Sequence, residues 1–168
     1  MRIDDIMPMR LFFTLLLIAS HFLLPAEPPV HANVVAHVLI DNYHNDLYGE
    51  VYLEKVLFAK ALREEADCVP SEMLSRCGPE YVAKYLKMSL NGEFVRFTQQ
   101  SMDVQKDYII YRFHLGKADP GISEVIVKTD YMFRYDDHAV IKLRIKIDEV
   151  EKHYNLNTSR KEITFTKN

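Results

Sequence analysis

The sequence predicts a mainly β protein, an antiparallel β-sandwich of about seven strands with a short helical insert. Two observations support this fold class. Apolar and polar residues alternate with period two over most of the chain after residue 33, and turn-forming residues separate the alternating segments. A third observation sets the insert apart, because residues 59–90 lose the alternation and take up helical spacing.

The expected strands differ in clarity. The clearest is Val140–Asp148, where apolar residues alternate with mostly basic ones, so that one face of the strand is buried and the other is solvated. Asn91–Gly92 favours a tight hairpin, and Asp119–Pro120–Gly121 favours a wider turn. The other expected strands are Val34–Asp41, Gly49–Phe58, Phe94–Gln99, Tyr108–Leu115, Ile122–Thr129 and Glu162–Thr166.

The insert contains two short helices joined by a segment with the only two cysteines of the chain. The helices are expected at 59–66 and at 79–90, and Pro79 suits the first turn of the second helix. Cys68 and Cys77 enclose eight residues. In an oxidising compartment such a pair favours a disulfide, which would stabilise the fold by roughly 2–3 kcal/mol. A redox pair and a metal site are the alternatives, although redox pairs usually have C-x-x-C spacing and structural zinc needs four ligands.

Residues 1–32 have the layout of a secretory signal peptide. Residues 11–24 form an apolar run, and the polar, proline-marked segment PAEPPVHA follows it. Val30 and Ala32 are the small residues that signal peptidase recognises, so cleavage is expected after Ala32, with cleavage after Ala26 as the alternative. The run is shorter than the roughly 20 residues that span a membrane, so we expect no transmembrane segment after signal removal. Acidic residues at positions 4 and 5 make Met7 and Met9 alternative starts.

The mature chain, residues 33–168, is then a single exported domain in the periplasm or outside the cell. Cleavage removes two basic and three acidic residues, which changes the formal net charge from −3 to −2. Nucleic acids and anionic membranes are bound by concentrated positive charge. We therefore expect neither as a partner.

Several motifs follow the apolar run at the start of the chain in a fixed order. They are a histidine near the mature start (His31 or His37), Phe58 and Leu62 in F-x-x-x-L, Tyr85 and Leu86, Asn91–Gly92, and the acidic turn and strand at 136–141. This order resembles that in a family of small exported bacterial proteins known only as a domain of unknown function. The resemblance covers nearly the whole mature chain and implies export and an immunoglobulin-like sandwich, but no known activity. The chain departs from the family pattern where an acidic pair is replaced by Ala59 and Lys60, and in the late turn around His138.

Five residues are candidate metal ligands for copper or zinc. Imidazole and carboxylate groups suit both metals, and Asp136, Asp137 and His138 form the most ligand-like cluster. His37 and His44 complete the candidate set, although the histidine spacing is irregular. A metal-binding envelope protein is therefore the alternative function, and a solvated turn is the simpler interpretation of the cluster.

No catalytic residues are assigned, because the chain has no nucleophile elbow and no glycine-rich phosphate loop. An enzyme built from dispersed residues stays an alternative.

The aromatic segment with Tyr131, Met132, Phe133 and Tyr135 does not alternate cleanly, so it either enters the core or forms an interaction surface. The function expected from the sequence is a binding or interaction module for a protein or small ligand in the cell envelope.

Overall fold

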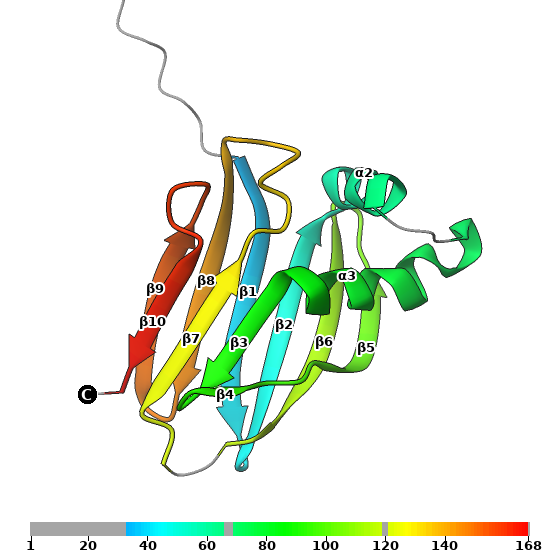
Figure 1. Ribbon diagram of the computed structural model, residues 1–168. Coiled ribbons are helices and arrows are strands. Elements are labelled where there is room, and N and C mark those ends of the chain that lie inside the picture. The colour runs from blue at the N-terminus through cyan, green and yellow to red at the C-terminus, as the bar shows by residue number, and fades with distance from the viewer. Residues whose placement is uncertain (1–32, 66–68, 119–120, 168) are drawn as a thin grey trace, which may run out of the picture. The chain divides into compact units, whose positions relative to one another are not determined.

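The computed structural model describes residues 33–65, 69–118 and 121–167, and this part of the chain is mainly β (Figure 1). Six strands form one sheet and four form another. In the larger sheet the spatial order is β5-β6-β2-β1-β8-β9, and in the smaller it is β10-β7-β3-β4. The strands are β1 (Asn33–Tyr43), β2 (Asp46–Glu54), β3 (Leu86–Leu90), β4 (Glu93–Phe94), β5 (Thr98–Val104), β6 (Tyr108–Lys117), β7 (Glu124–Thr129), β8 (Ala139–Ile147), β9 (Val150–Leu156) and β10 (Glu162–Thr166).

Most neighbouring strands are antiparallel, as expected, but β1 and β8 are parallel. Their register runs from the pair Asn33–Ala139 to the pair Asp41–Lys146, with a bulge between Val34 and Ala36. Strand β1 therefore lies in the middle of the larger sheet, with β2 on one side and β8 on the other.

The helical segment shares a layer with the smaller sheet. It consists of α2 (Lys55–Glu65), a 3₁₀ turn (Pro70–Glu72), a π-helical turn (Met73–Cys77) and α3 (Gly78–Tyr85). Figure 1 shows α3 and the smaller sheet on the same side of the larger sheet. The Tyr111 hydroxyl on β6 donates a hydrogen bond to the Leu74 carbonyl oxygen, at 2.7 Å. The Phe58 ring on α2 makes an edge contact with the Tyr111 ring, so the helices complete the layer that covers β2 and β6.

One hydrophobic core lies between the layers. The inner strands of the larger sheet contribute alternate residues, such as Val38 and Ile40 on β1 and Ile141 and Leu143 on β8. This is the burial that period-two alternation predicts for a sheet with one face packed on the core. None of the described helices has the length and hydropathy that a membrane-spanning helix requires.

The expected strand Gly49–Phe58 is too long at its end, because α2 begins at Lys55. The carboxylate of Glu54 accepts hydrogen bonds from the backbone N–H of Val56 at 3.0 Å and of Leu57 at 2.7 Å. These bonds satisfy two of the donors that every helix leaves unpaired at its start. The side chain of Glu54 therefore caps the start of α2, and β2 passes into this helix without a connecting loop.

The expected helix at 79–90 is too long as well, since α3 ends at Tyr85 and the chain continues directly as β3. Within β3 the apolar residues Leu86 and Met88 are buried, while Lys87 is exposed, which is the alternation of a strand. The expected strand Phe94–Gln99 is divided between β4 and β5, and β9 was not expected.

The expected hairpin turn is confirmed. Asn91 and Gly92 have φ values of 48° and 86°, and the pair Leu90–Glu93 flanks them, as in a tight two-residue hairpin. The expected signal peptide at 1–32, Cys68 and the turn residues 119–120 lie outside the described residues.

Candidate binding surface around Phe94

Phe94 is a large apolar residue on the surface, with 83 % of its area exposed. It lies on β4, the edge strand of the smaller sheet, and pairs with Ser89 on β3. Ser89 in turn pairs with Ile126 on β7, so Phe94 belongs to the outward-facing row of this sheet. Phenylalanine, like tyrosine and tryptophan, is enriched in protein interfaces relative to the rest of the surface.

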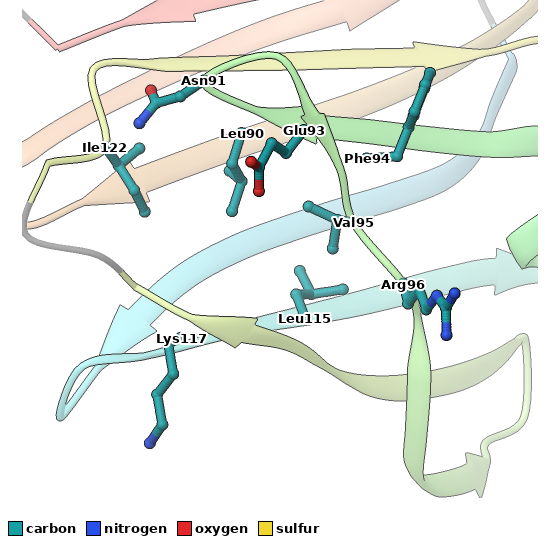
Figure 2. A pocket seen from close by; sticks show the side chains of 9 residues that line it. All are labelled: Leu90, Asn91, Glu93, Phe94, Val95, Arg96, Leu115, Lys117 and Ile122. Carbon is teal, nitrogen blue, oxygen red and sulfur yellow. The ribbon is translucent and has the colours of Figure 1, made fainter.

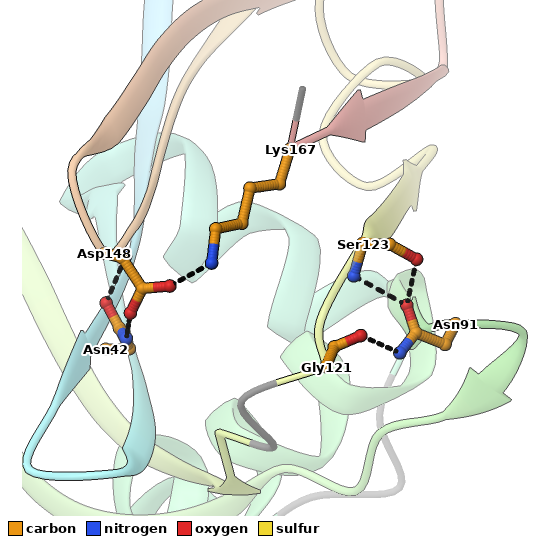
Figure 3. Close-up of polar contacts among 6 residues, drawn as sticks. All are labelled: Asn42, Asn91, Gly121, Ser123, Asp148 and Lys167. Carbon is orange, nitrogen blue, oxygen red and sulfur yellow. Dashed lines mark hydrogen bonds and ion pairs between the residues drawn. The ribbon is translucent and has the colours of Figure 1, made fainter.

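The hairpin that carries Phe94 is held in place by the side chain of Asn91 (Figure 3). Its Nδ2 donates to the Gly121 carbonyl oxygen at 2.9 Å. Its Oδ1 accepts from the backbone N–H and the hydroxyl of Ser123 at 3.0 and 3.1 Å, and from the Glu124 N–H at 3.1 Å. The hairpin is thus tied to the segment that leads into β7, and Phe94 is presented on a rigid support.

Three hollows meet at Phe94, and each has a volume within the roughly 300–1,000 Å³ of ligand pockets. The hairpin hollow has a volume of about 380 Å³ and is lined by Leu90, Asn91, Glu93, Phe94, Val95, Arg96, Leu115, Lys117 and Ile122. The helix hollow has about 530 Å³ and is lined by Ala83, Leu86, Lys87, Met88, Phe94, Val95, Arg96 and Phe97. The sheet hollow has about 520 Å³ and is lined by Lys87, Met88, Ser89, Phe94, Ile126, Lys128 and Glu162.

Figure 2 shows that the hairpin hollow has an apolar floor and charged margins. The side chains of Leu90, Val95 and Leu115 lie between the hairpin and the end of β6, whereas Lys117 and Arg96 extend away from this floor. Phe94 stands on the other side of β4 from Glu93, as alternation along a strand requires. We call Phe94 and its three hollows the Phe94 surface.

A second surface, the outward face of the larger sheet, is polar, and several of its charges are paired, as at Glu50. Glu50 accepts hydrogen bonds from Arg112 Nε and from the Tyr52 hydroxyl, both at 2.7 Å. Burial alone would raise the pKa of Glu50, but these two hydrogen bonds and the charges of Arg112 and Arg144 outweigh burial and lower the pKa. The carboxylate is therefore held in its charged form as a structural partner of the two arginines.

The structure does not bring the candidate metal ligands together. His37 is in the middle of β1, with its ring 6.2 Å from that of Tyr108, and burial followed by the charge of Lys142 lowers its pKa. His44 lies in the turn at the far end of β1. No group of three His, Cys, Asp or Glu side chains within residues 33–65, 69–118 and 121–167 is arranged to hold a metal ion.

Asp136, Asp137 and His138 lie just before β8, near the start of β1, and their contacts are those of a turn. Asp136 Oδ1 accepts from the His138 backbone N–H at 2.9 Å, and its Oδ2 accepts from Asn33 Nδ2 at 2.9 Å. The His138 ring lies 3.7 Å from the Asp137 carboxylate, and both side chains are well exposed. The Asp136 carboxylate thus fastens the chain before β8 to the first residue of β1.

The aromatic segment before β8 requires a correction, because Tyr131, Met132 and Phe133 are buried in the core and only Tyr135 is half-buried. Tyr131 is 1 % exposed, and its hydroxyl has no hydrogen-bond partner among the described residues. Burial raises the pKa of this hydroxyl well above its ordinary value. These three side chains are core residues, so the interaction surface expected here is not available to a partner.

Of the two cysteines, only Cys77 is described, at the end of the π-helical turn and 6 % exposed. Its pairing with Cys68 stays a prediction.

The sequence places Phe94 only at the start of an expected strand, Phe94–Gln99, and gives it no functional role. The register of the hairpin is the feature of the sequence that indicates an outward position for Phe94. A tight turn at Asn91–Gly92 pairs Leu90 with Glu93 and therefore Ser89 with Phe94, which places Phe94 on the polar face of β3.

A scan against protein-family models finds no match for the chain, and a search of curated proteins finds none either.

Proposed function

We propose that the protein is an exported binding module, periplasmic or secreted, that recognises a partner through the Phe94 surface. The observation that supports this proposal is an 83 % exposed phenylalanine with hollows on several sides. Aromatic anchors in such positions dominate the energetics of many interfaces.

The expected immunoglobulin-like arrangement of the two sheets is also part of the proposal. The two-sheet architecture supports it, whereas the parallel β1–β8 pair departs from it.

Rigid presentation favours binding, because less conformational freedom is lost when the partner docks. The four hydrogen bonds of Asn91 hold the hairpin before a partner arrives. Fully burying a phenylalanine side chain contributes about 1.5–3 kcal/mol. Phe94→Ala should therefore weaken binding by about 10- to 150-fold, while leaving the free energy of unfolding within about 0.5 kcal/mol of the wild-type value.

Selection from a random peptide library displayed on phage, followed by affinity measurements on purified protein, tests the proposal. The matched control is Tyr43→Ala, because Tyr43 is also an exposed aromatic residue, at 66 %, and lines none of the three hollows. Ligands that lose affinity for Phe94→Ala but bind Tyr43→Ala normally support the proposal. Ligands that bind Phe94→Ala as well as wild type, or the absence of any enriched ligand, refute it.

Export is tested separately by the amino terminus of protein expressed in a secreting host. Removal of residues 1–32 predicts that the mature chain starts at Asn33. Protein that retains the apolar run in the soluble cell fraction would contradict export without bearing on the Phe94 surface.

A further inference from the structure

Basic side chains outnumber acidic ones around Phe94. Four basic residues and two acidic ones line the three hollows, whereas the whole chain has 21 basic and 24 acidic residues. The balance of charge on the Phe94 surface is therefore the reverse of that in the rest of the protein. The residues are Lys87, Arg96, Lys117 and Lys128 on the basic side and Glu93 and Glu162 on the acidic side.

Two of the four basic groups are already paired. Lys117 Nζ lies 3.0 Å from the Asp46 carboxylate, and Lys128 Nζ lies 3.5 Å from that of Glu162. The Lys128 pair crosses from β7 to β10 on the rim of the sheet hollow. These two lysines hold less uncompensated charge for a ligand than the other two.

Lys87 and Arg96 are the basic groups that remain. Lys87 Nζ donates to the Ala83 carbonyl oxygen at 2.8 Å, and in the described part of the chain neither residue forms an ion pair with an acidic side chain. Both residues line the helix hollow together with Phe94. Glu93 lines the hairpin hollow with Arg96 but makes no ion pair with it. An incoming carboxylate would thus find two cations beside an aromatic ring.

We infer that the partner of the Phe94 surface is an extended, acidic peptide segment, an inference that rests on the proposed function. Apolar side chains of the segment occupy the hollows on either side of Phe94, against Val95, Phe97 and Ile126. A carboxylate of the segment lies between Lys87 and Arg96. In an extended chain every second side chain faces the same way, so an acidic residue at i+2 between apolar residues at i and i+4 presents all three groups to the row of hollows.

Shape favours a peptide over a membrane surface. Elements that lie on a membrane surface present a continuous apolar face, flanked by basic residues, that is buried at the boundary of headgroups and acyl chains. Phe94 has concave, apolar-lined hollows beside it instead, including the helix hollow of about 530 Å³ and the sheet hollow of about 520 Å³. Concave, largely preformed hollows are the form that groups of a bound ligand fill.

Three synthetic peptides of equal length test the inference by fluorescence anisotropy. One has Phe, Asp and Leu in turn at every second position with Ser between them, a second has Lys in place of every Asp, and a third has Asn. The wild-type protein should bind the acidic peptide at least about tenfold more tightly than the basic one, and added salt should reduce the difference. The double variant Lys87→Glu with Arg96→Glu should prefer the basic peptide. Lys106→Glu, in the β5–β6 turn away from the hollows, is the matched control and should leave the preference unchanged.

The outcomes separate this inference from the proposed function. Binding that needs Phe94 but shows no preference for acidic peptides overturns the inference and leaves the proposed function standing. Acidic preference that persists in Phe94→Ala overturns both. Failure of all three peptides overturns the inference, and Phe94-dependent binding to vesicles of equal parts phosphatidylcholine and phosphatidylglycerol would then assign the surface to lipid.

Discussion

Replacing Gly78 by alanine measures how tightly the helical segment is seated against the larger sheet. Gly78 begins α3 with φ near −61°, so its backbone conformation suits any residue. An added Cβ would lie 2.0 Å from the Tyr111 hydroxyl oxygen and 2.8 Å from the ring carbon that bears it. In an open helix the same substitution would stabilise by about 1 kcal/mol, so helix propensity and packing make opposite predictions.

Packing should win, because Tyr111 has no room to retreat. Its side chain is fully buried, and its hydroxyl donates to the Leu74 carbonyl oxygen at 2.7 Å. Forcing an extra carbon into a packed core costs about 1–3 kcal/mol. Displacing the hydroxyl from its acceptor leaves a buried donor unpaired, at about 1–3 kcal/mol. With the helix gain offset against these terms, Gly78→Ala should lower the free energy of unfolding by about 1–5 kcal/mol.

Urea unfolding followed by tyrosine fluorescence and circular dichroism gives the free energies directly, since the chain has ten tyrosines and no tryptophan. Tyr111→Phe removes the hydroxyl without the clash, and the double variant should be less destabilised than the two single effects combined. A Gly78→Ala protein that is as stable as wild type, or more stable, would show that α3 is not packed against Tyr111 as described.

Three further predictions concern single side chains. Asn91→Ala should destabilise by about 1–3 kcal/mol through the lost hairpin hydrogen bonds, and hydrogen exchange at the Ser123 amide should accelerate; unchanged exchange would contradict the proposed support of the hairpin. Cys68→Ser should lower stability by roughly 2–3 kcal/mol, and nonreducing mass spectrometry should find no free thiol in the wild type; two titratable thiols would end the disulfide hypothesis. Hydrogen bonds from His114 and then Lys117 lower the pKa of Asp46 in the folded state. The contribution of Asp46 to the free energy of unfolding should therefore be fully present above the unfolded-state pKa of the carboxyl group and be lost as the pH falls through the folded-state pKa. Asp46→Asn should therefore flatten the acid side of a stability profile measured by urea unfolding, and parallel profiles would exclude this ion pair as a source of pH dependence.

Strands whose burial alternates strictly could be predicted from the sequence, because an apolar or polar side chain at each position indicates whether that position faces the core or the solvent. Val140–Asp148 is the clearest example, and its alternate residues Ile141, Leu143, Ile145 and Ile147 are buried in β8 as expected. The helix start at Lys55 could not be predicted in this way, because it depends on one carboxylate folding back onto the backbone. For Leu86–Leu90 the sequence pattern predicts helix, since its apolar residues continue the spacing of the helix before it, but the segment is strand β3.

The candidate surface was harder to predict than the fold. Tyr131 and Phe94 have similar aromatic side chains, yet one is in the core and the other is on the surface, and local composition does not distinguish them. What separates them is pairing across strands and the path of the chain after β7, both of which depend on contacts distant in sequence. The register of the Asn91–Gly92 hairpin was the one local feature that placed Phe94 on the outside.

The parallel pairing of β1 with β8 has a consequence for the order in which the chain can fold. Strand β1 can form a hairpin with β2 as soon as both exist, but its other edge is completed only by β8, and their ends are joined by the hydrogen bonds between Asn42 and Asp148, 106 residues apart. Both helices and most of the smaller sheet lie between them in sequence. Such non-local pairing slows folding, so we expect refolding in milliseconds to seconds and a ribosome-bound chain that keeps one edge of β1 unpaired until Ala139–Ile147 has been made.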